Sequence, residues 1–230
     1  MTRSTNARIA GFTFLFYIAA GIARLVLFGG ATSGAGIAAK LAGIARHATD
    51  VRVCVLLELL QCFSALVLAV TLYAITREQD PDLAMLALTC RVGEGLLGAT
   101  GIGGTLALLG LATATGAEAP DSGAAHALGA YLLTNTVALT ATFFAAGSTL
   151  FSWLLLRGRM VPIPLAWLGV AASALLVAAL PLQLAGLLGQ VGWFGSLTRL
   201  MWFPMLVFEL VLAFWLLVRG VAAPASRPAA

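Results

Sequence analysis

The sequence carries little charge for its length. Lys, Arg, Asp and Glu make up 10% of its 230 residues, whereas soluble globular domains carry about 25%. Hydrophobic residues make up 61%, and the mean hydropathy is +1.01. So few charges cannot cover a water-exposed surface, so the composition excludes an ordinary soluble domain.

Residues that bind metals and haem are also scarce. The three cysteines, Cys54, Cys62 and Cys90, lie within apolar stretches and form no Cys-x-x-Cys pair, so we expect them to be small packing residues. His47 and His126 are the only histidines. We expect both to lie near the external surface, so a bis-histidine haem or a three-histidine zinc site within the membrane would need ligands that the chain lacks. We therefore expect no cofactor.

A basic stripe interleaved with aromatic residues, which would indicate a nucleic-acid partner, is absent as well. The formal net charge is +4, and the distribution of Lys and Arg among the segments between apolar runs explains it. We expect the partners to be the lipid bilayer and membrane components, and no nucleic acid.

Long apolar runs are what the sequence has in abundance. A helix of about 20 residues crosses a bilayer core of about 30 Å, and six runs reach that length. They cover residues 9–28, 51–75, 83–111, 125–156, 163–188 and 201–218. Charged residues, prolines and glycines separate them, and such residues end membrane helices. The runs lack the alternating pattern of membrane strands, so the sequence predicts an all-α, polytopic membrane bundle of about six helices.

A shorter amphipathic pattern lies between the first two runs. Ile37, Leu41, Ile44 and Ala48 recur at helical spacing, which predicts a short external helix lying on the membrane surface. It is either a lid over the outer end of the bundle or a helix that simply connects two spans, and the sequence leaves both readings open.

The domain organisation follows from these segments. We predict a cytoplasmic N-terminus over residues 1–8, a single six-helix membrane domain over 9–218 and a disordered cytoplasmic tail over 219–230. With the N-terminus inside the cell, seven Lys and Arg residues lie inside and four outside, as the positive-inside rule requires of an inner-membrane protein. Arg3 and Arg8 before the first run resemble a secretory signal, but the run exceeds a typical signal core, which favours an uncleaved helix over cleavage.

Ionisable residues inside the apolar runs are the most informative feature. Each costs about 2.5–3.5 kcal/mol at the centre of a membrane helix, so we expect them to turn toward one another inside the bundle. With two neighbouring amides, the predicted intramembrane polar cluster, a candidate ligand site, comprises Arg24, Glu58, Gln61, Arg91, Glu94, Asn135 and Glu209.

Spacing and depth predict how these charges pair. Arg91 and Glu94 stand three residues apart and can pair along one helix. Arg24, Glu58 and Glu209 lie toward the outer face, so we expect ion pairs among these three.

Glycines crowd the third apolar run. A Gly-x-Gly-x-x-Gly pattern over residues 93–98 has no strand before it and therefore cannot be a dinucleotide loop. Small residues let membrane helices approach closely. We expect this run, extended by Gly101, Gly103 and Gly104, to form close helix contacts.

Short motifs resemble those of a known family. The motifs are Arg8-Ile9-Ala10-Gly11, Arg91-Val92-Gly93-Glu94, His126 at the start of the fourth run, Phe208-Glu209-Leu210 and Trp215-Leu216-Leu217-Val218-Arg219-Gly220. In these the chain resembles the bacterial multi-pass membrane family labelled domain of unknown function 4386, along nearly its whole length. The resemblance implies a multi-pass membrane protein and implies no particular activity.

Three functional classes remain. The predicted intramembrane polar cluster favours a protein that binds or transports a small amphipathic or lipid-like molecule. The glycine-rich third run favours an accessory subunit that packs against a membrane partner or a second copy of the chain. An intramembrane enzyme using a buried Glu is the third class, although the sequence contains no evident nucleophile with an adjacent base.

Overall fold

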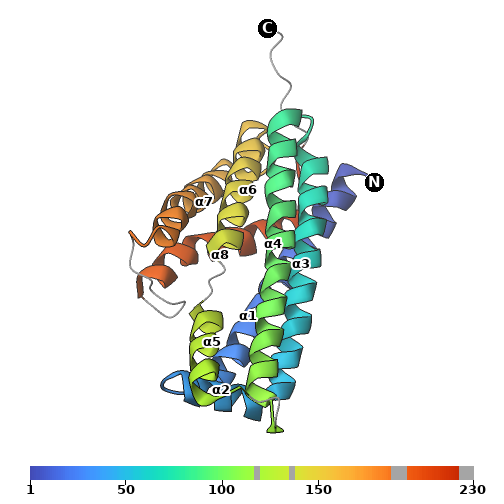
Figure 1. Cartoon of the computed structure of the whole chain (residues 1–230). Helices are drawn as coiled ribbons and strands as arrows, with labels where there is room; N and C mark the ends of the chain where they lie inside the picture. The colour runs from blue at the N-terminus through green and yellow to red at the C-terminus, as the bar shows by residue number, and fades with distance from the viewer. Residues whose placement is uncertain (117–119, 135–137, 188–195, 223–230) are drawn as a thin grey trace. The chain divides into compact units, whose positions relative to one another are not determined.

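The structure is a computed structural model of the whole chain, and it describes residues 1–116, 120–134, 138–187 and 196–222. Within these ranges every regular element is an α-helix, and there are eight (Figure 1). They are α1 (Arg3–Ala31), α2 (Ile37–Arg46), α3 (Ala48–Thr76), α4 (Pro81–Thr113), α5 (Ser122–Thr134), α6 (Ala138–Arg157), α7 (Ile163–Leu184) and α8 (Ser196–Val218).

Six of these helices are long and apolar enough to cross a membrane: α1, α3, α4, α6, α7 and α8. The predicted all-helical, multi-pass fold is therefore confirmed. Turn residues stand where the spans begin. Asp80 caps α4, since its Oδ1 accepts the Leu83 N–H at 3.2 Å. Pro162 directly precedes α7. Both residues suit helix starts.

The predicted fourth span, residues 125–156, differs from the structure. The chain forms two helices there instead, and only Leu139–Arg157 in α6 qualifies as a span. The other helix, α5, has 13 residues, and Asp121 caps it by accepting the Gly123 and Ala124 N–H groups at 2.8 Å each.

The described residues form two compact units, and α1, α3 and α4 contribute residues to both. Unit 1 falls within Met1–Phe16, Ser64–Gly95 and Ala138–Ala230, and unit 2 within Tyr17–Phe63 and Leu96–Val137. The single membrane domain expected over residues 9–218 stays a prediction.

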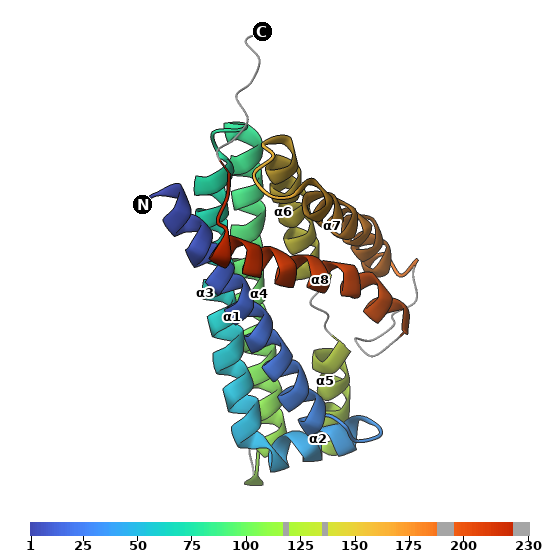
Figure 2. The same cartoon turned by 180° about the vertical axis from the view of Figure 1, so that it is seen from behind.

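Unit 1 packs α6, α7 and α8 with the first half of α1 and the adjoining halves of α3 and α4, and α8 crosses α1 in Figure 2. A Cβ added to Gly11 of α1 would lie 2.6 Å from the Ala213 carbonyl oxygen of α8, so glycine permits this crossing. At one end of the unit, Arg3 pairs with Glu78 and Arg157 with Asp80. These contacts bring together the start of α1, the α3–α4 turn and the end of α6. Two spans, α1 and α3, separate the first point from the second, and two more, α4 and α6, separate the second from the third, so all three belong on one side of a membrane.

Unit 2 contains the short helix predicted between the first two spans. Ile44 of α2 is fully buried with Ala31, Val51 and Leu108, so the apolar face of α2 packs inside this unit. The methyl groups of Ile37 and Leu41 lie against Gly129 of α5, and both views show α2 and α5 side by side (Figures 1 and 2). The presence of a short helix at this position is confirmed.

The glycines of α4 divide into two kinds. A Cβ on Gly93 would lie 2.7 Å from the Phe143 ring of α6, so this residue does permit close packing. Around Gly101, Gly103 and Gly104 the structure places no atom of a described residue within 4 Å of such a Cβ. The prediction of close contacts was therefore wrong for these three, because no described neighbour approaches α4 at these positions.

Candidate functional site

The charges buried within unit 1 meet around one arginine. Arg91 and Glu94 lie one turn apart on α4, and Arg91 Nη1 donates to Glu94 Oε2 at 2.8 Å. Glu209 reaches the same guanidinium from α8, with 3.7 Å between its Oε1 and Arg91 Nη2. The three side chains are 1%, 2% and 7% exposed. One cation thus holds two carboxylates out of contact with lipid.

Two aromatic rings complete the surroundings of Arg91. Its Cζ lies 4.7 Å from the centre of the Phe144 ring of α6 and 5.8 Å from that of Phe14 of α1. Arginine is attracted to the faces of aromatic rings, more strongly where water is excluded. Helices α1, α4, α6 and α8 therefore all contribute to holding this one side chain.

A small cavity adjoins the arginine within unit 1. It has a volume of about 10 Å³ and is lined by Arg91, Ser148 and Phe208 among others. Ser148 Oγ is buried and has no hydrogen-bond partner among the described residues. A cavity of this volume holds one water molecule at most, so it is polar but far too small for an amphipathic ligand.

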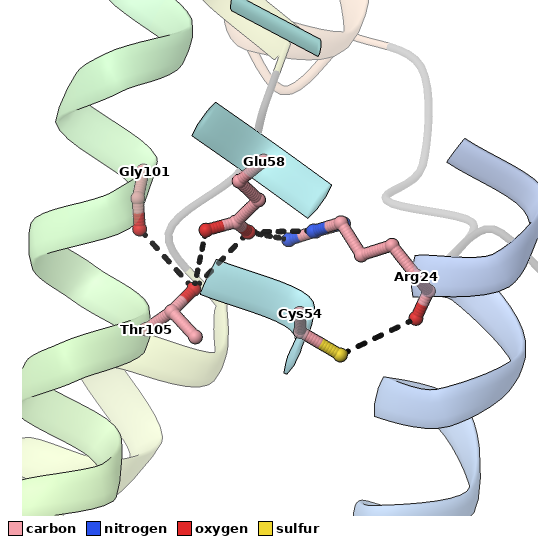
Figure 3. Close-up of polar contacts among 5 residues, drawn as sticks. All are labelled: Arg24, Cys54, Glu58, Gly101 and Thr105. Atoms are coloured by element: carbon pink, nitrogen blue, oxygen red, sulfur yellow. Dashed lines mark hydrogen bonds and ion pairs between the residues drawn. The ribbon is translucent and has the colours of Figure 1, made fainter. Parts of the chain in front are cut away.

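A second buried ion pair lies in unit 2. Arg24 of α1 donates from both Nε and Nη2 to Oε1 of Glu58 on α3 (Figure 3). The Glu58 side chain is 8% exposed, whereas that of Arg24 is 28% exposed. The carboxylate is enclosed, and the guanidinium is only partly covered.

Two further groups hold this pair in place. The Thr105 hydroxyl of α4 lies 3.1 Å from each oxygen of Glu58 and 3.2 Å from the Gly101 carbonyl oxygen, as Figure 3 shows. The Cys54 thiol lies 3.8 Å from the Arg24 carbonyl oxygen. Glu58 thus receives donors from two other helices, which fixes the side on which Arg24 must approach.

Arg24 retains unused donors. A guanidinium carries five N–H groups, and the contacts with Glu58 use two of them. The Phe28 ring lies one turn further along α1, with its centre 5.7 Å from Arg24 Cζ. Partly exposed and anchored from one side, Arg24 offers a positive, hydrogen-bonding surface within an apolar span.

The predicted cluster is therefore two sets of contacts, one in each unit. The Arg91–Glu94 and Arg24–Glu58 pairs are confirmed. Glu209 was expected to share the ion pairs of Arg24 and Glu58, but it contacts Arg91 instead.

The two predicted amides differ in what is described of them. Gln61 lies beside the Arg24–Glu58 pair, since a Cβ at Gly21 of α1 would stand 2.9 Å from its Nε2. Asn135 lies outside the described residues. Whether any member of the cluster binds a ligand stays a prediction.

Several contributors carry no signal in the sequence that would single them out. Phe14 and Phe144 are two of twelve phenylalanines, and only the packing of α1 and α6 brings them to Arg91. Thr105 shares a helical face with Arg91 and Glu94 at 100° per residue, which indicates a polar role without naming its partner. No three of the described His, Cys, Asp and Glu side chains come together as metal ligands.

Comparison with known proteins identifies a family and nothing closer. A family described as "Domain of unknown function (DUF4386)" matches residues 9–220. No curated protein matches the chain, and no solved structure does.

Proposed function

The chain belongs to the family labelled domain of unknown function 4386, and from that premise we propose that this integral membrane protein binds a small amphipathic molecule at Arg24. The head group of the ligand is anionic and accepts hydrogen bonds from the guanidinium. Its apolar tail lies along the same side of α1, where the half-buried Phe28 ring stands one turn from Arg24.

The observation that carries this proposal is the uneven exposure of the Arg24–Glu58 pair. An arginine whose only task was to neutralise Glu58 would be best enclosed with it, as Arg91 is with Glu94. Arg24 instead keeps N–H groups on a side that is partly open. It lies seven residues before the end of α1, or about 10 Å along the helix axis, which is within reach of the polar edge of the membrane.

The orientation of the chain is part of this proposal. We place the N- and C-termini on the cytoplasmic side of the inner membrane, because the Lys and Arg residues are more numerous on that side. Arg24 then lies toward the external end of its span, and the ligand enters from the external leaflet.

Binding of defined probes to the purified full chain tests the site. In a neutral detergent, we expect dodecyl phosphate to bind and dodecyltrimethylammonium not to bind, as counted by native mass spectrometry. Arg24→Gln removes a charge-assisted contact of about 1.5–3 kcal/mol, so its affinity for dodecyl phosphate falls on the order of tenfold or more. Arg52→Gln removes an exposed arginine of the same unit and serves as the matched control.

Glu58→Gln sharpens the test. It removes the carboxylate that competes with the ligand for Arg24, so dodecyl phosphate binds as tightly as to the wild type or more tightly. Equal affinities in Arg24→Gln and Arg52→Gln contradict the site. A second assay separates transport from binding alone by following dodecyl phosphate across the membrane of proteoliposomes. Transport requires that the wild type moves it and that Arg24→Gln does not.

A second function, as an accessory subunit, is supported by the uncovered glycines of α4. Gly103 leaves space that a helix of another chain can occupy, and small residues favour such contacts in membranes. Chemical crosslinking in native membranes tests this function. Cysteine substituted at Gly103 should crosslink to a partner, whereas cysteine at Phe144, a buried position, should not.

A further inference from the structure

A separate pocket lies at the end of unit 1 where α6 and α8 both stop. Its volume is about 430 Å³, and its wall includes Arg159 and Arg219 together with Trp215. None of the described residues that line it is acidic. Ligand sites for small molecules have volumes of this order, so the pocket is large enough for a lipid head group.

The backbone around the pocket is tied together by hydrogen bonds. The Ala222 N–H, beyond the end of α8, donates to the Met160 carbonyl oxygen at 3.0 Å, and Met160 N–H donates to the Leu155 carbonyl oxygen of α6 at 3.0 Å. Met160 itself is 1% exposed. The two chain segments that carry Arg159 and Arg219 are therefore held side by side by contacts that do not involve either arginine side chain.

Arg159 adopts a backbone conformation that does not suit arginine. Its φ of 49° is positive, a region that L residues other than Asn and Asp rarely occupy and in which glycine is normally found after a helix. Gly158 stands next to it and does not take this conformation, since glycines with positive φ among the described residues lie elsewhere. The turn places a long cationic side chain at a position where glycine would suit the backbone better.

No described residue compensates the charges of this pocket. At the same end of unit 1, Arg3 is paired with Glu78 and Arg157 with Asp80. For Arg159 and Arg219, both exposed, the structure gives no ion pair with any residue it describes. Two positive charges thus converge on one concave surface without a carboxylate.

The position of the pocket along the spans indicates what reaches it. Arg159 stands two residues after the end of α6 and Arg219 directly after the end of α8, so both lie at the polar edge of the membrane. Trp215, half-buried, is of the type that concentrates at this depth. Basic pockets between membrane helices on the cytoplasmic side bind anionic head groups, and arginine matches phosphate oxygens in a two-point contact.

We propose that the pocket formed by Arg159, Arg219 and Trp215 binds a phosphate group, which the head group of an anionic phospholipid in the adjacent leaflet is best placed to supply. This site is independent of the site proposed at Arg24. It takes its ligand from the bilayer at the end of unit 1 where the α6–α7 turn and the end of α8 meet.

The test compares lipid retention by the full chain. Protein is purified from nanodiscs containing phosphatidylcholine and phosphatidylglycerol, and retained lipid is counted by native mass spectrometry. We expect the wild type to retain phosphatidylglycerol selectively and Arg159→Gln/Arg219→Gln to lose on the order of tenfold or more of that preference. Arg8→Gln/Arg77→Gln removes the same charge from exposed positions of unit 1 outside the pocket and should retain the lipid like the wild type.

Arg159→Gly separates loss of the site from loss of the fold. Glycine suits the positive φ, so the melting temperature stays the same or rises, while phosphatidylglycerol retention falls. If 10 mM inorganic phosphate displaces the retained lipid, and the wild type does not prefer phosphatidylglycerol to phosphatidylcholine, the pocket binds a soluble phosphate compound. Equal retention by the pocket variant and the Arg8/Arg77 variant, together with no effect of inorganic phosphate, overturns the proposal.

Discussion

Replacing Arg91 with methionine should destabilise the protein more than any other single loss of charge in unit 1. Methionine keeps much of the volume of the side chain but removes the guanidinium from between Glu94 and Glu209. Both carboxylates are at most 7% exposed, so neither can be hydrated where it stands. The rings of Phe14 and Phe144 lose their cation at the same time.

The expected magnitude follows from this burial. Removing one partner of a buried ion pair costs about 3–5 kcal/mol, and the Arg91 set has two acidic partners. The matched control is Arg157→Met, which breaks the pair with Asp80 at 3.3 Å, where the side chains are 37% and 20% exposed. Such exposed pairs contribute about 0–1 kcal/mol, so the same substitution there should change stability little.

The free energy of unfolding in lipid bicelles, measured for the wild type and both variants, provides the assay. The triple variant Arg91→Met/Glu94→Gln/Glu209→Gln should recover most of the lost stability, because it leaves no buried charge without a partner. The reasoning is refuted if Arg91→Met and Arg157→Met are equally stable, or if the triple variant is less stable than Arg91→Met.

Three other predictions follow from packing and topology. Gly11→Ala should lower the free energy of unfolding by about 1–3 kcal/mol through overpacking against α8. Gly101→Ala, which meets no described neighbour, should leave the free energy of unfolding unchanged or raise it slightly. Equal losses in the two variants would contradict the α1–α8 crossing. Ile44→Asp should destabilise unit 2 by several kcal/mol, because the residue is fully buried among apolar side chains and the new carboxylate has no partner there; a wild-type melting temperature would show that α2 does not pack as described. In a chain whose native cysteines are replaced, a membrane-impermeant maleimide applied to intact cells should label cysteine at Lys40 and not at Glu78; the reverse pattern would invert the proposed orientation.

The number of spans and the all-helical fold could be predicted from the sequence, because a helix needs about 20 apolar residues to cross a bilayer. The apolar runs overlap α1, α3, α4, α7 and α8, and the largest difference is at the start of α1, which begins at Arg3 and not at residue 9. The run over residues 125–156 misled, because α5 is as apolar as a span but too short to cross the membrane. Hydropathy shows whether a segment is apolar enough for a membrane, but it does not show where a helix within that segment ends.

The charged residues could be identified, but their partners could be predicted only where the partner lies on the same helix. Spacing alone predicts the Arg91–Glu94 pair, since residues three apart share a helix face. The contact of Glu209 with Arg91 depends on how α8 crosses the rest of unit 1. Phe14, Phe144 and Thr105 enter the two sites for the same reason, and helix–helix crossings are not encoded in any local pattern.

The account rests on the claim that charges within the spans are stabilised by one another inside the protein, and an exchange of Arg24 and Glu58 tests this most directly. Arg24→Glu and Glu58→Arg each place like charges together and should each lower the free energy of unfolding in bicelles. The combined exchange, Arg24→Glu/Glu58→Arg, restores opposite charges and should be more stable than either single variant. Losses that simply add, leaving the exchanged protein the least stable of the three, would show that these side chains do not meet.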